Sequence, residues 1–422
     1  MEQTNPKIAI GTDDFYKVVK EGLLFVDKTL FIKEIIEDYS EVLLITRPRR
    51  WGKTFNMRML QCFFAESVDG KPTAELFAQF KIAQVADGKY IKEHQGKYPV
   101  IFITFKDVQA DSFEGCFKGI TLLIKKIYDR FANQIGEDGI KKLGRLAQMV
   151  FKEILEDEPS QTLIEQSLLM LSQYLYEIYK QRVYILIDEY DKPLNAAYGK
   201  DYFTKLSDFM RNIFSSCLKG NSYLKKGIMT GVLRISKGTM LSGLNNLNEF
   251  SLLDERFAEF FGFTIEEVAD LIQKLKLDIK IEDIKTWFNG YKIGKLVMCN
   301  SWSIMKCLEQ KGKLAPYWVD TTDDTLIKRA LVAASPEIKE RLSTLMQDKS
   351  IEVKINKNIT YDRLTENERS FCSSSSISIS SSESTIHRFL LLKRGAGIIN
   401  SSSSWLAIVG ITGLLPFFGL IF

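Results

Sequence analysis

The sequence predicts an α/β protein in which a mostly parallel sheet is flanked by helices. Short apolar runs alternate with longer segments of helical periodicity from residue 7 to about residue 350. Two of these runs lead into residues that suit phosphate chemistry, because Gly52-Lys53-Thr54 follows the first and Asp188-Glu189 ends a later one. A strand that enters a turn and then a helix at Gly-Lys-Thr is typical of a phosphate-binding loop.

The apolar runs predict five core strands, and the segments between them predict the covering helices. The expected strands are 42–46, 100–105, 183–187, 227–233 and 249–253. Residues 112–182 show helical periodicity without a clear strand, so we expect them to form helices that cover the sheet.

Composition divides the chain into four parts. Residues 1–255 carry the strand–helix alternation, and 256–358 suit a small helical or winged-helix-like lid domain. A serine-rich linker is expected at 359–404, since serine runs cannot bury enough apolar surface to fold. The tail at 405–422 carries no charged side chain, and two interpretations stay open: a transmembrane helix, or an out-of-frame remnant.

The net charge and the numbers of histidines and cysteines limit the classes of function that the sequence supports. The 57 basic and 53 acidic residues leave a net charge of +4, which by itself gives no argument for nucleic-acid binding. Two histidines and six cysteines without a Cys-x-x-Cys pair provide no zinc-ligand spacing. The first residues lack a basic start and an apolar run, so we expect a cytoplasmic body, with a C-terminal membrane anchor only if the tail is a true span.

The segment around Gly-Lys-Thr predicts the fold of a P-loop nucleoside triphosphatase. Gly52 lets the backbone approach the phosphates, Lys53 would reach the β- and γ-phosphates, and the Thr54 hydroxyl would join the shell of Mg²⁺. The general motif also has a glycine five residues before Gly52, and this chain has Arg47 there. The sequence leaves three roles open for the arginines of this turn: contact with phosphate, binding of nucleic acid, or inter-domain salt bridges. These arginines are Arg47, Arg49 and Arg50.

A carboxylate pair and two residues after it complete the predicted site. Asp188 is expected to hold Mg²⁺, and Glu189 to orient or deprotonate the attacking water. Thr230, on the next strand, stands where a polar residue senses the γ-phosphate. Arg234 is expected either to contact phosphate or a neighbouring subunit, or to be an ordinary surface arginine.

Several segments together resemble the bacterial AAA-ATPase-like family. The resemblance covers roughly residues 7–359 and rests on segments 10–36, 43–60, 183–194, 230–246, 287–294 and 299–304. The family's own loop reads Arg-Pro-Arg-Arg-x-Gly-Lys-Thr, so Arg47 fits the family although it departs from the general motif. The resemblance implies ATP and Mg²⁺ as cofactors. By that match, Lys53 and Thr54 are phosphate and Mg²⁺ contacts, and Asp188 and Glu189 are the metal-binding and water-activating carboxylates. The whole predicted site has Lys53 and Glu189 as catalytic residues and Thr54 and Asp188 as metal ligands. Its nucleotide contacts are Arg50, Trp51, Gly52, Lys53, Thr54, Thr230 and Arg234.

Three functions are compatible with these residues. The first is an ATPase that couples hydrolysis to conformational change on an unknown macromolecular target, with or without homo-oligomerisation. The second is a nucleotide-binding switch or scaffold with little turnover, and the third is a truncated, inactive family member. Family members commonly continue into a nuclease-like domain, but here only Glu352-Val353-Lys354 matches part of its motif. A nucleic-acid partner therefore rests on family analogy alone.

Overall fold

A computed structural model gives the conformation of most of the first three hundred residues. It describes residues 7–232, 241, 243–252, 254–288, 291–293, 295–315 and 317, together with 336, 340, 351–354 and 376–379. The chain divides into two compact units, of which one is Gly11–Phe260 and the other combines Phe261–Phe422 with Met1–Ile10. The domain limits expected at 255 and 358 remain predictions.

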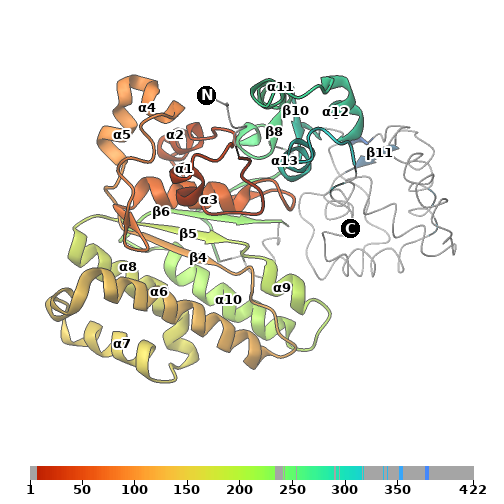
Figure 1. Ribbon diagram of the computed structural model, residues 1–422. Helices are drawn as coiled ribbons and strands as arrows, with labels where there is room; N and C mark the ends of the chain where they lie inside the picture. Colours follow the sequence, from red (N-terminus) through yellow and green to blue (C-terminus); the bar gives the residue numbers. More distant parts are fainter. Residues whose placement is uncertain are drawn as a thin grey trace. The chain divides into compact units, whose positions relative to one another are not determined.

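A five-stranded parallel sheet forms the centre of the Gly11–Phe260 unit (Figure 1). Its order is β4-β5-β6-β1-β7, so β6 lies between the strand that precedes Gly-Lys-Thr and the strand that ends in Asp188. The strands are β1 (Val42–Thr46), β4 (Val100–Thr104), β5 (Val183–Asp188), β6 (Leu224–Gly231) and β7 (Leu247–Phe250). All five predicted strands are present, and the predicted α/β fold is confirmed.

Helices cover both faces of this sheet, as parallel strands joined by crossover helices require (Figure 1). One face carries α1 (Phe15–Lys20), α2 (Leu30–Glu37) and α3 (Lys53–Phe64). The other carries α6 (Phe113–Lys142), α8 (Gln161–Tyr179) and α10 (Phe203–Leu218), with α7 (Arg145–Glu156) packed on α6. The predicted helical segment 112–182 is thus three helices.

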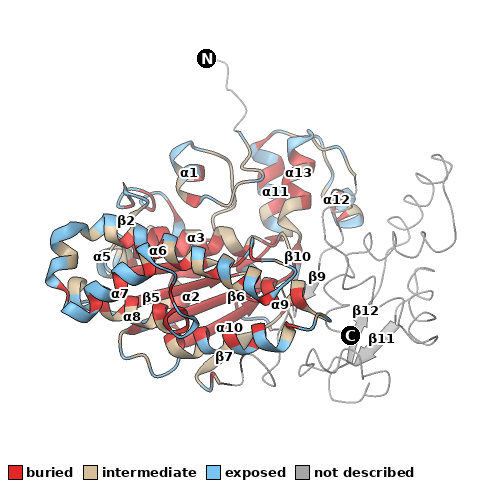
Figure 2. Ribbon diagram, turned by 90° about the horizontal axis from the view of Figure 1, so that it is seen from below, coloured by how far each residue is buried: buried red, intermediate tan, exposed pale blue. Residues whose placement is uncertain are grey.

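Buried apolar side chains along the strands explain why the sheet forms here. Every residue of β1 and β5 is buried, which gives these strands continuous apolar runs rather than an alternating pattern. Figure 2 shows the buried residues concentrated on the strands and on the helix faces that meet them. Ser112 and Ser160 accept hydrogen bonds from backbone N–H groups at the starts of α6 and α8, which fixes where these helices begin.

Short elements complete the unit between the strands and helices already given. A two-stranded hairpin follows α3, and a small helical group precedes β4. These elements are β2 (Ser67–Val68), β3 (Lys71–Pro72), α4 (Lys81–Gln84), η1 (Val85–Gly88), α5 (Lys89–His94), α9 (Lys192–Ala197) and η2 (Ala258–Phe260).

The second unit, where described, combines helices with a three-stranded antiparallel sheet of order β8-β10-β9. Thr264 and Glu267 form a reciprocal capping box at the start of α11, which fixes that helix. The elements are β8 (Phe263–Thr264), α11 (Ile265–Lys274), α12 (Ile281–Trp287), β9 (Tyr291–Ile293), β10 (Leu296–Cys299) and α13 (Ser301–Glu309).

The serine-rich segment contains four described residues, and they form a strand rather than an irregular linker. Strand β12 (Ser376–Ile379) pairs antiparallel with β11 (Ile351–Lys354). Serine and isoleucine alternate in β12, which is the two-residue period of a strand. The apolar tail at 405–422 lies outside the described residues, and among the residues that are described, no helix has both the length and the apolar character needed to cross a membrane.

Candidate functional site

The segment from β1 to α3 has the backbone geometry of an anion-binding turn. Arg50 has φ 67° and Gly52 has φ 77°, and both values lie in the left-handed region. Gly52 caps α3 in this conformation, and its carbonyl accepts the first helical hydrogen bond from Asn56 N at 3.0 Å. The N–H groups at the start of a helix have no partner within the helix and point at an approaching anion. Glycine suits position 52 because a side chain would be strained in this backbone conformation.

Arg47 stands where the general motif has a glycine, and its side chain hydrogen-bonds to backbone carbonyls of the same chain rather than facing the turn. Its side chain is 1 % exposed. Nη1 donates to the carbonyls of Thr46 at 2.8 Å and Phe250 at 3.2 Å, and Nη2 donates to the carbonyl of Arg256 at 3.4 Å. Burial lowers the pKa of Arg47 to about 10, while the charge of Asp254 acts in the opposite direction. The reading in which Arg47 supplies charge to a phosphate is therefore not supported by this geometry.

Asp188 is the centre of a cluster of three threonine hydroxyls. Its carboxylate is fully buried at the carboxyl end of β5. Oδ2 accepts from Thr54 Oγ1 at 2.8 Å and from Thr104 Oγ1 at 3.2 Å, and Oδ1 accepts from Thr230 Oγ1 at 2.7 Å. Burial raises the pKa of Asp188, and the hydrogen bonds from Thr230 and Thr54 oppose that rise.

Lys53 and Glu189 form an ion pair beside this cluster. Lys53 Nζ lies 3.7 Å from Glu189 Oε1 and donates to the Pro48 carbonyl at 3.0 Å. The lysine side chain is 3 % exposed and the glutamate side chain 21 %. Glu189 has φ 53°, a left-handed conformation that a non-glycine residue adopts at a cost of roughly 1–3 kcal/mol. A strained residue of this kind, next to a buried carboxylate, is typical of a functional site.

The structure thus brings five of the sequence-predicted residues into one cluster. Lys53 and Thr54 come from the start of α3, Asp188 and Glu189 from the end of β5, and Thr230 from the end of β6. Carboxyl ends of parallel strands share one edge of a sheet, which is where ligands bind in open α/β folds. Of the other predicted residues, Arg50 is partly exposed and Arg234 lies outside the described residues.

Two observations adjust the predicted residue set. Trp51 is 1 % exposed, so its ring packs inside the protein and only its backbone is placed to meet a ligand. Thr104 was not predicted, although it hydrogen-bonds the same Asp188 oxygen as Thr54. Its sequence carried no local signal, because only the register of β4 with β5 places Thr104 opposite Asp188.

The donor set at this site fits a magnesium ion. Mg²⁺ takes oxygen ligands, binds through one or two carboxylates together with phosphates, and keeps several waters. The Thr54 hydroxyl and an Asp188 oxygen lie 2.8 Å apart, and Glu189 adds a second carboxylate nearby. These residues are thus of the chemical kind that such an ion takes as ligands.

Comparison with known proteins identifies the family of this chain. A family model described as "Predicted AAA-ATPase" matches residues 9–241, which is more than half of the chain. The chain belongs to the AAA-ATPase-like family. The match includes Gly52–Thr54, Asp188, Glu189 and Thr230, and membership of this family supports nucleotide binding.

One curated relative of this AAA-ATPase-like protein extends over most of the chain. An uncharacterized protein encoded in the vnfD 5′ region of Azotobacter chroococcum mcd 1 is 27 % identical over 348 residues. The aligned residues make up 80 % of this chain and 59 % of the relative. The chain thus spans less than two thirds of the relative's length.

Proposed function

We propose that this AAA-ATPase-like protein binds Mg²⁺-ATP at Gly52–Thr54 and hydrolyses it with Glu189 as the group that activates water. The observation that carries the proposal is the convergence of Thr54, Thr104 and Thr230 on the Asp188 carboxylate, with Lys53 paired to Glu189 beside it. Hydroxyl, carboxylate and ammonium groups are the groups that phosphoryl transfer from Mg²⁺-ATP requires at one place.

Each residue of this cluster has a role in the proposed reaction. The N–H groups after Gly52 bind the phosphates, and the Lys53 ammonium neutralises charge on the β- and γ-phosphates. Thr54 and Asp188 would hold Mg²⁺ through oxygen, directly or through water, and a bound ion would supply positive charge against the phosphates. Glu189 accepts the proton of the attacking water, and Thr230 links the Asp188 carboxylate to the end of β6.

The Lys53–Glu189 contact couples nucleotide binding to the activation of water. While Lys53 Nζ lies 3.7 Å from Glu189, the carboxylate is engaged with the cation that the phosphates also need. Phosphate oxygens that bind Lys53 compete for that cation and free Glu189 to act on water. Binding of nucleotide and activation of the base are therefore linked through one side chain.

The same contact supports a second candidate, a nucleotide-binding switch with little turnover. If Glu189 stays paired with Lys53 when nucleotide is bound, the phosphates bind but no base is available for water. Both candidates predict binding, and only the ATPase predicts steady release of phosphate.

Three proteins separate these functions: the unmodified chain, Lys53→Ala and Glu189→Gln. We would measure Mg²⁺-dependent ATP binding by calorimetry and phosphate release in the steady state. For an ATPase, Lys53→Ala loses both, while Glu189→Gln keeps binding and loses turnover by about 100-fold or more, the usual contribution of a general base. Binding by the unmodified chain without turnover would establish the switch, and absence of binding by folded protein would exclude both.

A further inference from the structure

A cavity of about 610 Å³ lies in the Gly11–Phe260 unit, away from the proposed ATP site. Its wall includes Gln61 in the last turn of α3, Val100 at the start of β4, and the β2–β3 hairpin. The proposed ATP site lies at the start of α3 and the end of β4 instead. The two sites are therefore at opposite ends of the same two elements, and none of the ATP-site residues lines the cavity.

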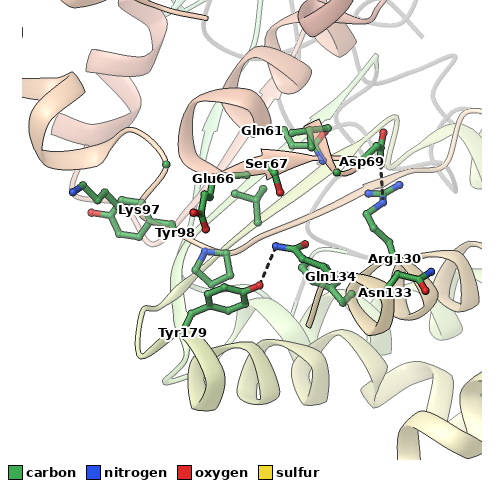
Figure 3. A pocket seen from close by; sticks show the side chains of 17 residues that line it. Gln61, Glu66, Ser67, Asp69, Lys97, Tyr98, Arg130, Asn133, Gln134 and Tyr179 are labelled. Atoms are coloured by element: carbon green, nitrogen blue, oxygen red, sulfur yellow. Dashed lines mark hydrogen bonds and ion pairs between the residues drawn. The ribbon is translucent and has the colours of Figure 1, made fainter. Parts of the chain in front are cut away.

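Two cations line this cavity, and one of them is oriented by an acidic partner. Arg130 Nε pairs with Asp69 Oδ1 at 3.1 Å, and its two terminal nitrogens are not used in that contact (Figure 3). A guanidinium held through Nε presents its terminal N–H groups as a fork that matches a phosphate or carboxylate. The second cation is the exposed Lys97.

Amide and phenol groups also line this cavity. Gln134 Nε2 donates to Tyr179 Oη at 2.9 Å, which leaves the amide oxygen of Gln134 and the hydroxyl proton of Tyr179 for another partner (Figure 3). Asn133, the residue before Gln134 on α6, adds a second amide. Burial raises the pKa of Tyr179, so its hydroxyl remains a donor at neutral pH. Side-chain amides pair with the polar edges of nucleobases, and aromatic rings stack on their faces.

We propose that this cavity binds a small nucleotide, with its heterocycle at Asn133, Gln134 and Tyr179 and its phosphate at Arg130. The volume lies within the range of about 300–1,000 Å³ that small-molecule sites occupy. The lining carries amide and phenol groups for the base of such a ligand and a guanidinium for its phosphate. A peptide added as a further strand is disfavoured, because β2 and β3 have only two residues each.

The test measures binding of nucleoside monophosphates to the full chain carrying Lys53→Ala. That substitution weakens the proposed ATP site, so binding in this background reports on the cavity even if the chain proves unable to bind ATP. AMP, GMP, CMP and UMP are titrated by calorimetry, beside inorganic phosphate and a single-stranded tetranucleotide. We expect one monophosphate or more to bind with a 1:1 ratio, while phosphate alone binds at least tenfold more weakly.

Variants of the lining show whether the bound nucleotide occupies this cavity. Arg130→Gln and Tyr179→Phe, both at partly exposed side chains, are each expected to weaken binding at least tenfold with an unchanged thermal midpoint. Arg145→Gln is the matched control, because Arg145 is an exposed arginine on α7 outside the cavity.

Three results would overturn the proposal. They are absence of binding by every monophosphate, equal binding of inorganic phosphate and nucleotide, and nucleotide binding that both lining variants retain. Tight binding of the tetranucleotide without binding of any monophosphate would also overturn it, in favour of a site for single-stranded nucleic acid.

Discussion

At the residue scale, Arg47 shows how the phosphate-binding turn can form without the first glycine of the general motif. The guanidinium donates to three backbone carbonyls, two of which belong to residues 250 and 256. The side chain therefore ties the beginning of the phosphate-binding turn to the end of β7 and the segment after it. A glycine at position 47 would leave those carbonyls without these donors, in a place where buried acceptors are costly.

Arg47→Gly is accordingly expected to destabilise the protein rather than to restore a better phosphate site. Loss of the three hydrogen bonds should lower the free energy of unfolding by about 2–4 kcal/mol, with no gain in ATP affinity. Urea denaturation and ATP calorimetry measure the two effects, and Arg47→Lys should fall between Arg47→Gly and the unmodified chain. A stable Arg47→Gly protein that binds ATP more tightly would contradict this assignment.

Lys226 is a second buried cation whose energetic effect depends on pH. Its ammonium donates to the carbonyls of Ile35 and Asp38, and Nζ lies 3.8 Å from Asp38 Oδ1. Burial lowers the pKa of Lys226 to about 8, with the Asp38 charge opposing that change and Lys225 and Arg256 adding to it. Asp38 is also paired with Arg256, at 2.6 Å from Nη1.

The sign of the pH effect follows from the number of protons bound in each state. Between pH 8 and about 10.5 the unfolded chain keeps the Lys226 proton while the folded protein releases it, so Lys226 makes the folded state more stable as pH rises. The slope is at most about 1.4 kcal/mol per pH unit. Lys226→Met should remove this contribution, as measured by urea denaturation at pH 7.5, 8.5 and 9.5. Lys225→Met, at the exposed neighbour, is the control and should keep most of the slope, because burial is the main cause of the lowered pKa of Lys226.

At the scale of elements, the end of β6 connects the start of the phosphate-binding turn to the segment that carries Asp188 and Glu189. Arg47 N donates to the carbonyl of Gly231, and Tyr190 N donates to the carbonyl of Thr230. A Cβ placed on Gly231 would lie 2.5 Å from Tyr190 Cε1 and 2.6 Å from Asp191 Oδ1. Tyr190 is fully buried, so the ring has no free space into which to move.

Gly231→Ala should therefore force β6 away from the segment that carries Glu189. We expect a loss of about 1–3 kcal/mol in the free energy of unfolding, typical of overpacking, together with weaker ATP binding. Gly144→Ala is the matched control, because a Cβ at Gly144 meets nothing within 4 Å and its φ is −59°. Equal stability of Gly231→Ala and the unmodified chain would show that the neighbouring ring can move after all.

The elements also show how far the sequence alone could lead. The limits of β1 were predicted to the residue because its apolar run is uninterrupted. The start of β6 was not, since Lys225 and Lys226 break the apolar pattern although Lys226 is buried by bonds to distant carbonyls. Thr104 was missed for a similar reason: a threonine that ends a strand has no local signal, and only the register with β5 places it at Asp188. Long-range pairings of this kind are not encoded in any short segment.

For the whole molecule, the contacts divide the chain so that every described residue of the proposed ATP site lies in one unit. Gly11–Phe260 contains all five parallel strands and the helices on both faces. A unit with its own sheet and buried apolar residues has what independent folding requires.

The fragment of residues 11–260 is therefore expected to fold and unfold in a single cooperative transition and to bind ATP within threefold of the affinity of the full chain. Circular dichroism during heating and ATP calorimetry test this, with Lys53→Ala in the same fragment as the control for site-specific binding. A fragment that stays unfolded would show that residues outside 11–260 are needed to complete the unit.

The strand order also determines when β1 can pair with its neighbours during synthesis on the ribosome. β1 has β6 and β7 as its neighbours, and the first of these begins only at Leu224. At a translation rate of about 5–20 residues per second, the sequence Val-Leu-Leu-Ile-Thr waits roughly 10–40 s for its first pairing partner. For that interval an apolar, uncharged segment with high strand propensity lacks its final neighbours, and the hydrogen bond from Thr230 to Asp188 cannot yet form. We therefore expect nascent chains of this protein to need the helices made in the meantime, or chaperones, to keep β1 from pairing with other chains.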